Sequence, residues 1–80
     1  MNYSILTQES LGNNNWFIEL ELLPDNDFES QAIQNYEAGK ATDVETEMLE
    51  NQLQVALKGM TLLNLVRQRK NVFAVTAASR

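Results

Sequence analysis

The most apolar stretch of this chain, LQVALKGMTLLNLV at residues 53–66, restricts its possible folds more than any other feature. On a helix, this stretch is polar only along a narrow line and apolar over most of the circumference, so it requires burial on several sides. A chain of 80 residues offers little cover, because a chain of this length buries only about 60% of its unfolded surface. The stretch therefore predicts either the core helix of a small domain or a helix that another chain covers.

The residues around this stretch predict one long helix over residues 42–70. Thr42 and Glu45 have the spacing of a capping box, which closes the start of a helix. Glutamates lie near the expected start and basic residues near the expected end, as the helix dipole favours. At a rise of about 1.5 Å per residue, such a helix would be about 40 Å long. We therefore expect it to protrude, to bend or to be covered by another chain.

The first third of the chain alternates as a β-hairpin does, over residues 1–23. In WFIELELL, residues 16–23, the side chains of one face are apolar, and the preceding SLGNNN supplies residues that favour turns. Pro24 then ends the second strand, since it lacks the N–H group that a sheet ladder needs. A short helix is expected over residues 27–38, with Gly39 at its end.

Together these elements predict an α+β fold in a single domain over residues 1–80. The predicted order is β-β-α-α, with the N-terminal antiparallel hairpin packed on the long C-terminal helix. Residues 71–80 form either a tail or a short edge strand. Gly59, inside the expected helix, costs about 1 kcal/mol relative to alanine. It marks either a bend or a smooth patch where another backbone approaches closely.

Charge is distributed unevenly along the chain, whose net charge is −5. Residues 1–57 contain eleven acidic residues and one basic residue, a net charge of −10, and residues 58–80 carry +5. Three arrangements would explain this asymmetry: internal pairing, head-to-tail assembly, or an acidic face directed at a basic partner. The basic cluster RQRK, residues 67–70, has no interleaved aromatic residues, so we expect no direct binding of nucleic acid.

The sequence offers little for catalysis or for metal binding. It contains no histidine and no cysteine, so the commonest general base and two common metal ligands are missing. Glu19 and Glu21 share one strand face, as on any solvated strand. The acidic run of Asp25, Asp27 and Glu29 lacks the spacing of a calcium loop and suits helix capping. We expect no enzymatic activity, no cofactor and no metal, and an acidic surface made of these side chains.

No stretch of about 20 apolar residues is present, so we expect no membrane span. The first residues lack the basic flank and the apolar core of a signal peptide. These features predict a cytoplasmic protein that does not bind membranes.

We predict a non-enzymatic protein–protein interaction module that self-associates, or binds a protein partner, through the expected long helix. One alternative is a small acidic inhibitor of the phage-encoded type, which mimics the charge of nucleic acid on a binding protein. A second alternative follows from the apolar, capped helix, which resembles the short subunits of secretion-system rods and needles: a helical subunit of a larger structural assembly. The predicted interface residues are Leu53, Ala56, Leu57, Gly59, Met60, Leu63 and Leu65.

Overall fold

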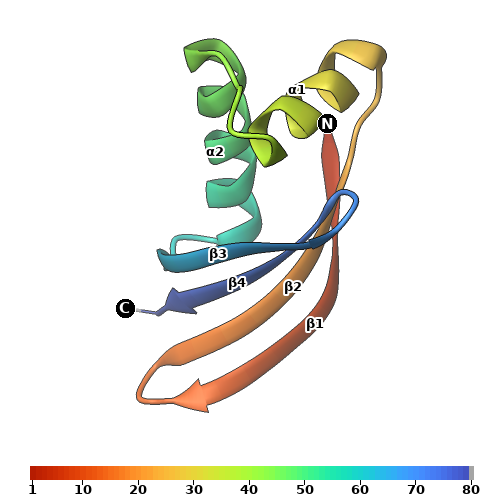
Figure 1. Ribbon diagram of the computed structural model, residues 1–80. Helices are drawn as coiled ribbons and strands as arrows, with labels where there is room; N and C mark the ends of the chain where they lie inside the picture. The colour runs from red at the N-terminus through yellow and green to blue at the C-terminus, as the bar shows by residue number, and fades with distance from the viewer. Residues whose placement is uncertain (80) are drawn as a thin grey trace.

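The computed structural model describes residues 1–79, in which two helices lie on one side of a four-stranded antiparallel sheet (Figure 1). The strands are ordered β1-β2-β4-β3 across the sheet. The last of these strands in the chain therefore lies in the interior of the sheet, and β1 and β3 form its edges. The elements are β1 (Asn2–Gly12), β2 (Asn15–Leu23), α1 (Asp27–Glu37), α2 (Asp43–Leu57), β3 (Thr61–Arg69) and β4 (Val72–Ala78).

The hairpin of β1 and β2 is closed by the asparagines of the SLGNNN segment. Gly12 pairs with Asn15, and Asn13 and Asn14 between them have φ angles of 53° and 64°. Two consecutive residues with positive φ make the tight turn that suits the twist of antiparallel strands, and asparagine tolerates this conformation better than most residues. The hairpin occupies the residues in which the sequence predicts it.

Side-chain caps fix the starts of both helices. Asn26 accepts a hydrogen bond from the backbone N–H of Glu29 at 2.9 Å and so begins α1. At α2, the backbone N–H of Glu45 donates to the Thr42 hydroxyl at 3.2 Å, and the Thr42 N–H donates to the Glu45 carboxylate at 2.9 Å. This reciprocal pair is the capping box that the spacing of the two residues predicts.

The predicted long helix over residues 42–70 is wrong. α2 ends at Leu57, because Lys58 and Gly59 both take left-handed conformations, with φ angles of 52° and 88°. A glycine just after the end of a helix is a common stop, since glycine adopts positive φ without a steric penalty. Gly59 therefore lies outside the helix, and a Cβ placed on it would meet nothing within 4 Å.

The residues after this turn form a second hairpin. β3 and β4 pair antiparallel, with Arg69 opposite Val72, and Asn71 in the tight turn has a φ angle of 64°. The segment 71–80, expected as a tail or an edge strand, instead contains β4, which lies between β2 and β3. Within residues 1–79 the fold is therefore α+β with the order β-β-α-α-β-β, and the predicted β-β-α-α domain with a hairpin packed on a long C-terminal helix is wrong.

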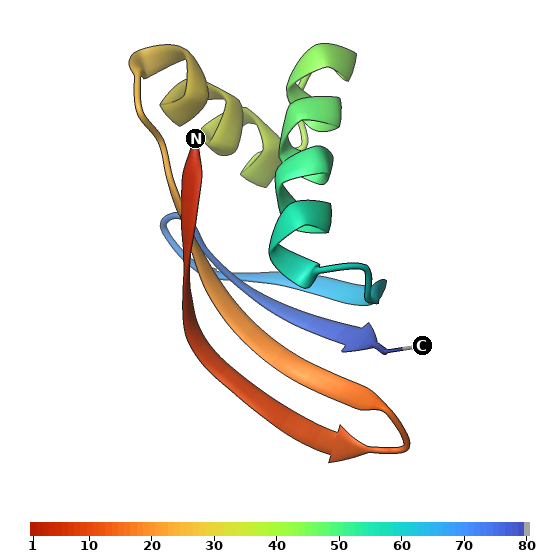
Figure 2. The same cartoon turned by 180° about the vertical axis from the view of Figure 1, so that it is seen from behind.

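The core lies between the helices and one face of the sheet. Ile18 pairs with Val75 and Leu20 with Phe73, so these side chains of β2 and β4 point to the same face. α2 packs on this face, and α1 packs beside α2 (Figure 2). Each fully buried large apolar side chain contributes about 1.5–3 kcal/mol, so this cluster is the main source of stability. The cluster contains Ile18, Leu20, Leu22, Ile33, Leu49, Leu53, Ala56, Leu57, Phe73, Val75 and Ala77.

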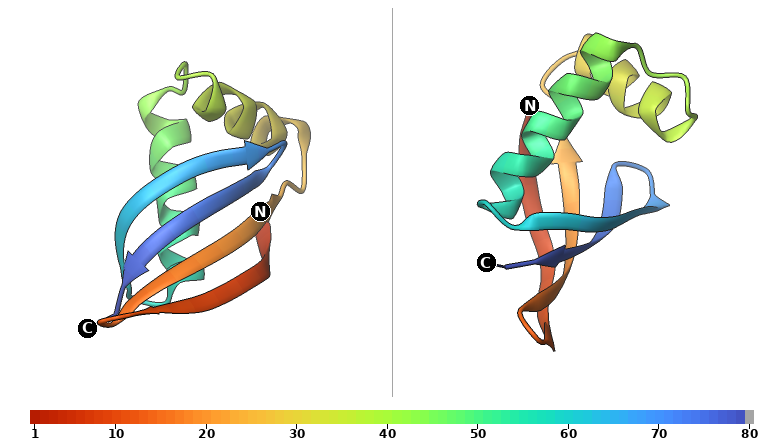
Figure 3. Two further views of the ribbon diagram at one scale, coloured as in Figure 1. Left: turned by 60° about the horizontal axis from the view of Figure 1, so that its bottom comes forward. Right: turned by 90° about the vertical axis from the view of Figure 1, so that its left-hand side faces the viewer.

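The opposite face of the sheet carries no helix in the described part of the chain (Figure 3). Glu19 and Glu21 point to this open face, because they alternate along β2 with the buried residues Ile18 and Leu20. The partner of Glu19 on β4 is the small residue Ala74. The sheet thus has one apolar face under the helices and one open face on which acidic and small side chains mix with apolar ones, among them Phe17, Val66 and Val72.

Replacing Gly59 with alanine tests the stop of α2. We expect Gly59→Ala to lower the free energy of unfolding by about 1–2 kcal/mol, since a Cβ strains a residue held at positive φ. Lys58→Ala is the matched control: that position is also left-handed but already carries a Cβ, so the change should be below about 0.5 kcal/mol. Urea denaturation measures both variants, and equal effects would contradict a stop that depends on glycine.

Candidate functional site

The predicted interface residues lie in two different places. Leu53, Ala56 and Leu57 belong to α2 and are at most 4% exposed, so they are part of the hydrophobic core. Gly59 lies in the turn after α2. Met60 lies between this turn and β3, and Leu63 and Leu65 belong to β3.

The outer side of Thr61–Arg69, here called the β3 edge, has an unpaired backbone. β3 pairs with β4 on one side, and no strand among residues 1–79 pairs with it on the other (Figure 3, left). Leu63 is 55% exposed and Val66 is 52% exposed, whereas Met60 and Leu65 pack partly against the core. The β3 edge therefore combines unpaired N–H and C=O groups with exposed apolar side chains.

Val66 is a residue of this surface that the predicted interface does not include. Its Cα partner on β4 is Ala74, which in turn pairs with Glu19 of β2. Residues paired in this way point to the same face, so Val66 lies on the open face of the sheet. Alternation along a strand selects Val66, whereas the predicted helix over residues 42–70 does not.

An ion pair joins α1 to the hairpin of β3 and β4. The Nε of Arg67 lies 2.8 Å from Oε2 of Glu37, whose side chain is only 10% exposed. The other carboxylate oxygen of Glu37 accepts a hydrogen bond from the backbone N–H of Asn71 at 3.3 Å. One carboxylate thus holds both the edge strand and its turn against the helix. The uneven charge of the chain, for which internal pairing is one explanation, is the signal for this contact in the sequence.

A shallow groove of about 290 Å³ opens beside this ion pair. It is lined by Tyr36, Glu37, Leu65, Arg67 and Phe73. The rings of Tyr36 and Phe73 meet edge to face, with centroids 6.4 Å apart and an angle of 66° between their planes. Burial, followed by the charge of Glu50, raises the pKa of the Tyr36 hydroxyl. The groove is thus an aromatic recess beside the β3 edge, and its carboxylate, that of Glu37, is already paired with Arg67.

The predicted acidic surface is also divided. Glu19 and Glu21 lie on the open face of the sheet, whereas Asp25, Asp27 and Glu29 gather where the chain enters α1. Asp27 and Glu29 are in the first turn of the helix, where the positive end of the helix dipole stabilises them. The carboxylates of Asp25, Asp27 and Glu29 therefore partly serve contacts within the chain.

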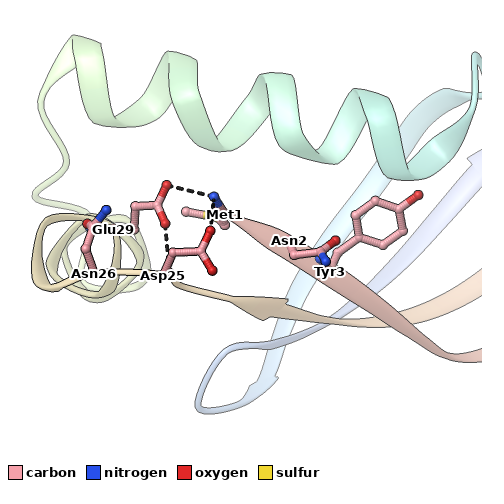
Figure 4. Close-up of polar contacts among 6 residues, drawn as sticks. All are labelled: Met1, Asn2, Tyr3, Asp25, Asn26 and Glu29. Carbon is pink, nitrogen blue, oxygen red and sulfur yellow. Dashed lines mark hydrogen bonds and ion pairs between the residues drawn. The ribbon is translucent and has the colours of Figure 1, made fainter.

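The amino group of Met1 lies between two of these carboxylates (Figure 4). Its nitrogen is 2.9 Å from Oδ2 of Asp25 and 2.9 Å from Oε2 of Glu29. Hydrogen bonds to Glu29 and then Asp25 raise the pKa of this amino group above its ordinary value. The pKa of the Glu29 carboxyl is lowered, first by a hydrogen bond that the backbone N–H of Asp25 donates to it at 2.8 Å, and then by the amino group of Met1. These contacts fasten the start of β1 to α1.

Glu45 joins the two helices. It is only 7% exposed, and the side-chain amide of Asn35 donates to its two carboxylate oxygens at 3.0 and 3.3 Å. The pKa of the Glu45 carboxyl is lowered, first by the backbone N–H of Thr42 and then by Asn35. A single ionised carboxylate thus caps α2 and holds α1 beside it.

No family model, curated protein or solved structure matches this chain. Residues 1–79 contain no group of three or more acidic side chains placed to hold a metal ion. Over the same residues, neither helix has the length and apolar character needed to cross a membrane. The absence of a metal, of a cofactor and of enzymatic activity stays a prediction, as does contact of the interface residues with another chain.

The pKa shifts predict how stability depends on pH. The lowered pKa values of Glu29 and Glu45 stabilise the fold above about pH 4.5, and this contribution is lost as the pH falls through the lowered values. The raised pKa of the Met1 amino group stabilises the fold below about pH 8, and this contribution is lost as the pH rises through the raised value. We expect urea midpoints to form a plateau between these limits and to fall on both sides.

Glu45→Gln isolates the acid side of this profile. Glutamine keeps the shape but cannot ionise, so the variant should be less stable at neutral pH and should lose less stability than the unmodified chain on acidification. The control is Glu47→Gln, an exposed glutamate of the same helix. An acid profile of Glu45→Gln identical to that of the unmodified chain would contradict the assignment.

Proposed function

We propose that this chain is a non-enzymatic protein–protein interaction module that self-associates through the β3 edge. The observation that carries the proposal is a nine-residue edge strand whose outer side has no partner strand among residues 1–79 and on which Leu63 and Val66 are more than half exposed. An edge strand presents a row of N–H and C=O groups that a strand of another chain can satisfy. Exposed apolar side chains on the same strand add their burial to that pairing.

The proposed surface differs from the helix face that the sequence suggests. Leu53, Ala56 and Leu57 already pack in the core, so they are not available to a second chain while the domain is folded. Leu63 lies on the strand itself, and Leu65 lines the groove beside it. The proposal therefore keeps the C-terminal part of the predicted interface and moves its centre from the helix to the strand.

Two bulges limit the part of the β3 edge that can pair regularly. The register shifts between Leu62 and Asn64 and again between Arg67 and Arg69, which leaves residues 64–67 as the regular stretch. Bulges bend an edge strand and are one means by which proteins protect such edges. We therefore expect association through this short stretch to be weak and to depend on concentration.

A second candidate function is the small acidic inhibitor that mimics the charge of nucleic acid. It is favoured by one observation, the position of Glu19 and Glu21 together on the open face of the sheet. Competition with DNA for a nucleic-acid-binding protein should then weaken steeply with salt and be lost in Glu19→Gln/Glu21→Gln. Competition that is insensitive to salt would contradict this candidate. The cytoplasmic location and the role as an assembly subunit stay predictions.

Val66→Glu tests the proposed self-association. A new charge on the β3 edge opposes strand pairing and replaces an apolar contact, so we expect dimers and larger species to disappear. Val55→Glu is the matched control, because Val55 is 63% exposed on α2, and it should associate like the unmodified chain. Analytical ultracentrifugation over a concentration series measures association, and circular dichroism verifies that both variants fold. An unmodified chain that remains monomeric to millimolar concentration, or equal loss in both variants, would overturn the proposal.

A further inference from the structure

We infer that the strand on the β3 edge is β1 of a second copy, so that copies join head to tail into one continuous sheet. This inference rests on the proposed self-association and specifies its geometry. β1 is the other edge of the sheet, and its outer side is likewise unpaired among residues 1–79. Like β3, it exposes apolar side chains: Ile5 is 38%, Leu6 41% and Leu11 55% exposed.

The strand directions suit this arrangement. Each neighbouring pair in the sheet is antiparallel, so β1 runs opposite to β3 within one copy. A second copy can be displaced across the strands, so that its sheet continues that of the first, with the rotation that sheet twist adds. Its β1 then runs antiparallel to the β3 of the first copy. The helices of both copies then lie on the same side, and the antiparallel order continues across the junction.

The regular stretches of the two edge strands lie at the same position along the strand direction. β1 is regular over residues 7–10, between its own register shifts, and β3 is regular over residues 64–67. Successive pairing across the strands places four residues in one row: Thr7, Glu19, Ala74 and Val66. A displaced copy that keeps the rows aligned therefore brings its Thr7 opposite Val66 of the first copy.

Charge favours this junction. Arg69 ends β3 and Lys70 follows it, whereas β1 carries Glu9 and lies beside Glu19 and Glu21 of β2. Arg69 and Glu21 share one row, because both pair with the same residue of β4. In the joined sheet, Arg69 lies two strand spacings, about 10 Å between backbones, from Glu21 of the next copy, the same separation as from Glu21 of its own copy, so it then has an acidic residue on each side. Two long side chains on one face can close that distance.

Both symmetric alternatives bring like charges together. β3 against β3 would join two edges that both carry Arg67 and Arg69, and β1 against β1 would join two edges that both carry Glu9, with Glu19 and Glu21 on the neighbouring strand β2. Two edges of the same charge attract each other less than two edges of opposite charge do. Closed twofold dimers are the commonest oligomers, but a head-to-tail contact is the one in which opposite edges meet, and it produces an open chain or a ring.

The sequence contains no cysteine, which permits a clean cross-linking test. In the variant Thr7→Cys/Val66→Cys, the two thiols of one copy are three strand spacings apart, about 14 Å. A disulfide requires Cα atoms within about 7 Å of each other, so the bond can form only between copies. Mild oxidation should produce a ladder of dimers, trimers and longer species on a non-reducing gel, several-fold above the cross-linking of Val55→Cys on α2.

Single-cysteine variants distinguish the geometries. For a head-to-tail junction, Thr7→Cys or Val66→Cys alone should stay at the level of the Val55→Cys control, and an equal mixture of the two should stop at the dimer. A disulfide dimer from Val66→Cys alone, as abundant as the products of the double variant, would show that β3 pairs with itself; it would overturn this inference and leave the proposed self-association standing. Cross-linking at the control level in every variant, with a monomeric unmodified chain, would overturn both.

Discussion

The pairing of β2 with β4 is the contact on which the rest of the structure depends. Ile18 opposite Val75 and Leu20 opposite Phe73 form the apolar surface that α2 covers. Among residues 1–79, β3 joins the sheet only through β4, so without the pairing of β2 with β4 these residues would form two separate hairpins. An isolated hairpin is at best marginally stable in water. The two central strands therefore form a single unit, to which each edge strand and each helix is attached.

Three glutamates, which from the sequence alone would be expected on the surface, hold the remaining elements against the two central strands and against each other. Glu37 ties α1 to the hairpin of β3 and β4, Glu45 ties α1 to α2, and Glu29 ties α1 to the start of β1. Hydrogen bonds to ionised groups are stronger than those between neutral groups. α1 buries only Ala32 and Ile33 fully, so these polar contacts position a helix that has little apolar surface of its own in the core.

The sequence predicts the secondary structure of a segment well where its apolar residues fit only one period, that of a strand or that of a helix. β2 alternates strictly and both helices begin at clear caps, whereas residues 58–70 fit two periods. In β3, the bulge beside Leu63 places Leu62 and Leu65 on the same face three residues apart, which is the spacing of a helix. The predicted interface depends on the same ambiguity. Leu57 is buried in a cluster with residues of β2 and β4, and a helix over residues 42–70 would leave no hairpin of β3 and β4 to form that cluster. Gly59 was the local sign that the helix stops.

The position of β4 also affects how the chain folds as it is synthesised. β2 leaves the ribosome about 50 residues before its central partner, and at roughly 5–20 residues per second this delay lasts several seconds. During that time the apolar row of β2 lacks the strand that completes it, and contacts so distant in sequence form slowly. Neighbouring nascent chains on one messenger would expose the same unpaired strands side by side. A chaperone that shields β2 during this delay would therefore keep its apolar row from contacting the same strand of a neighbouring chain.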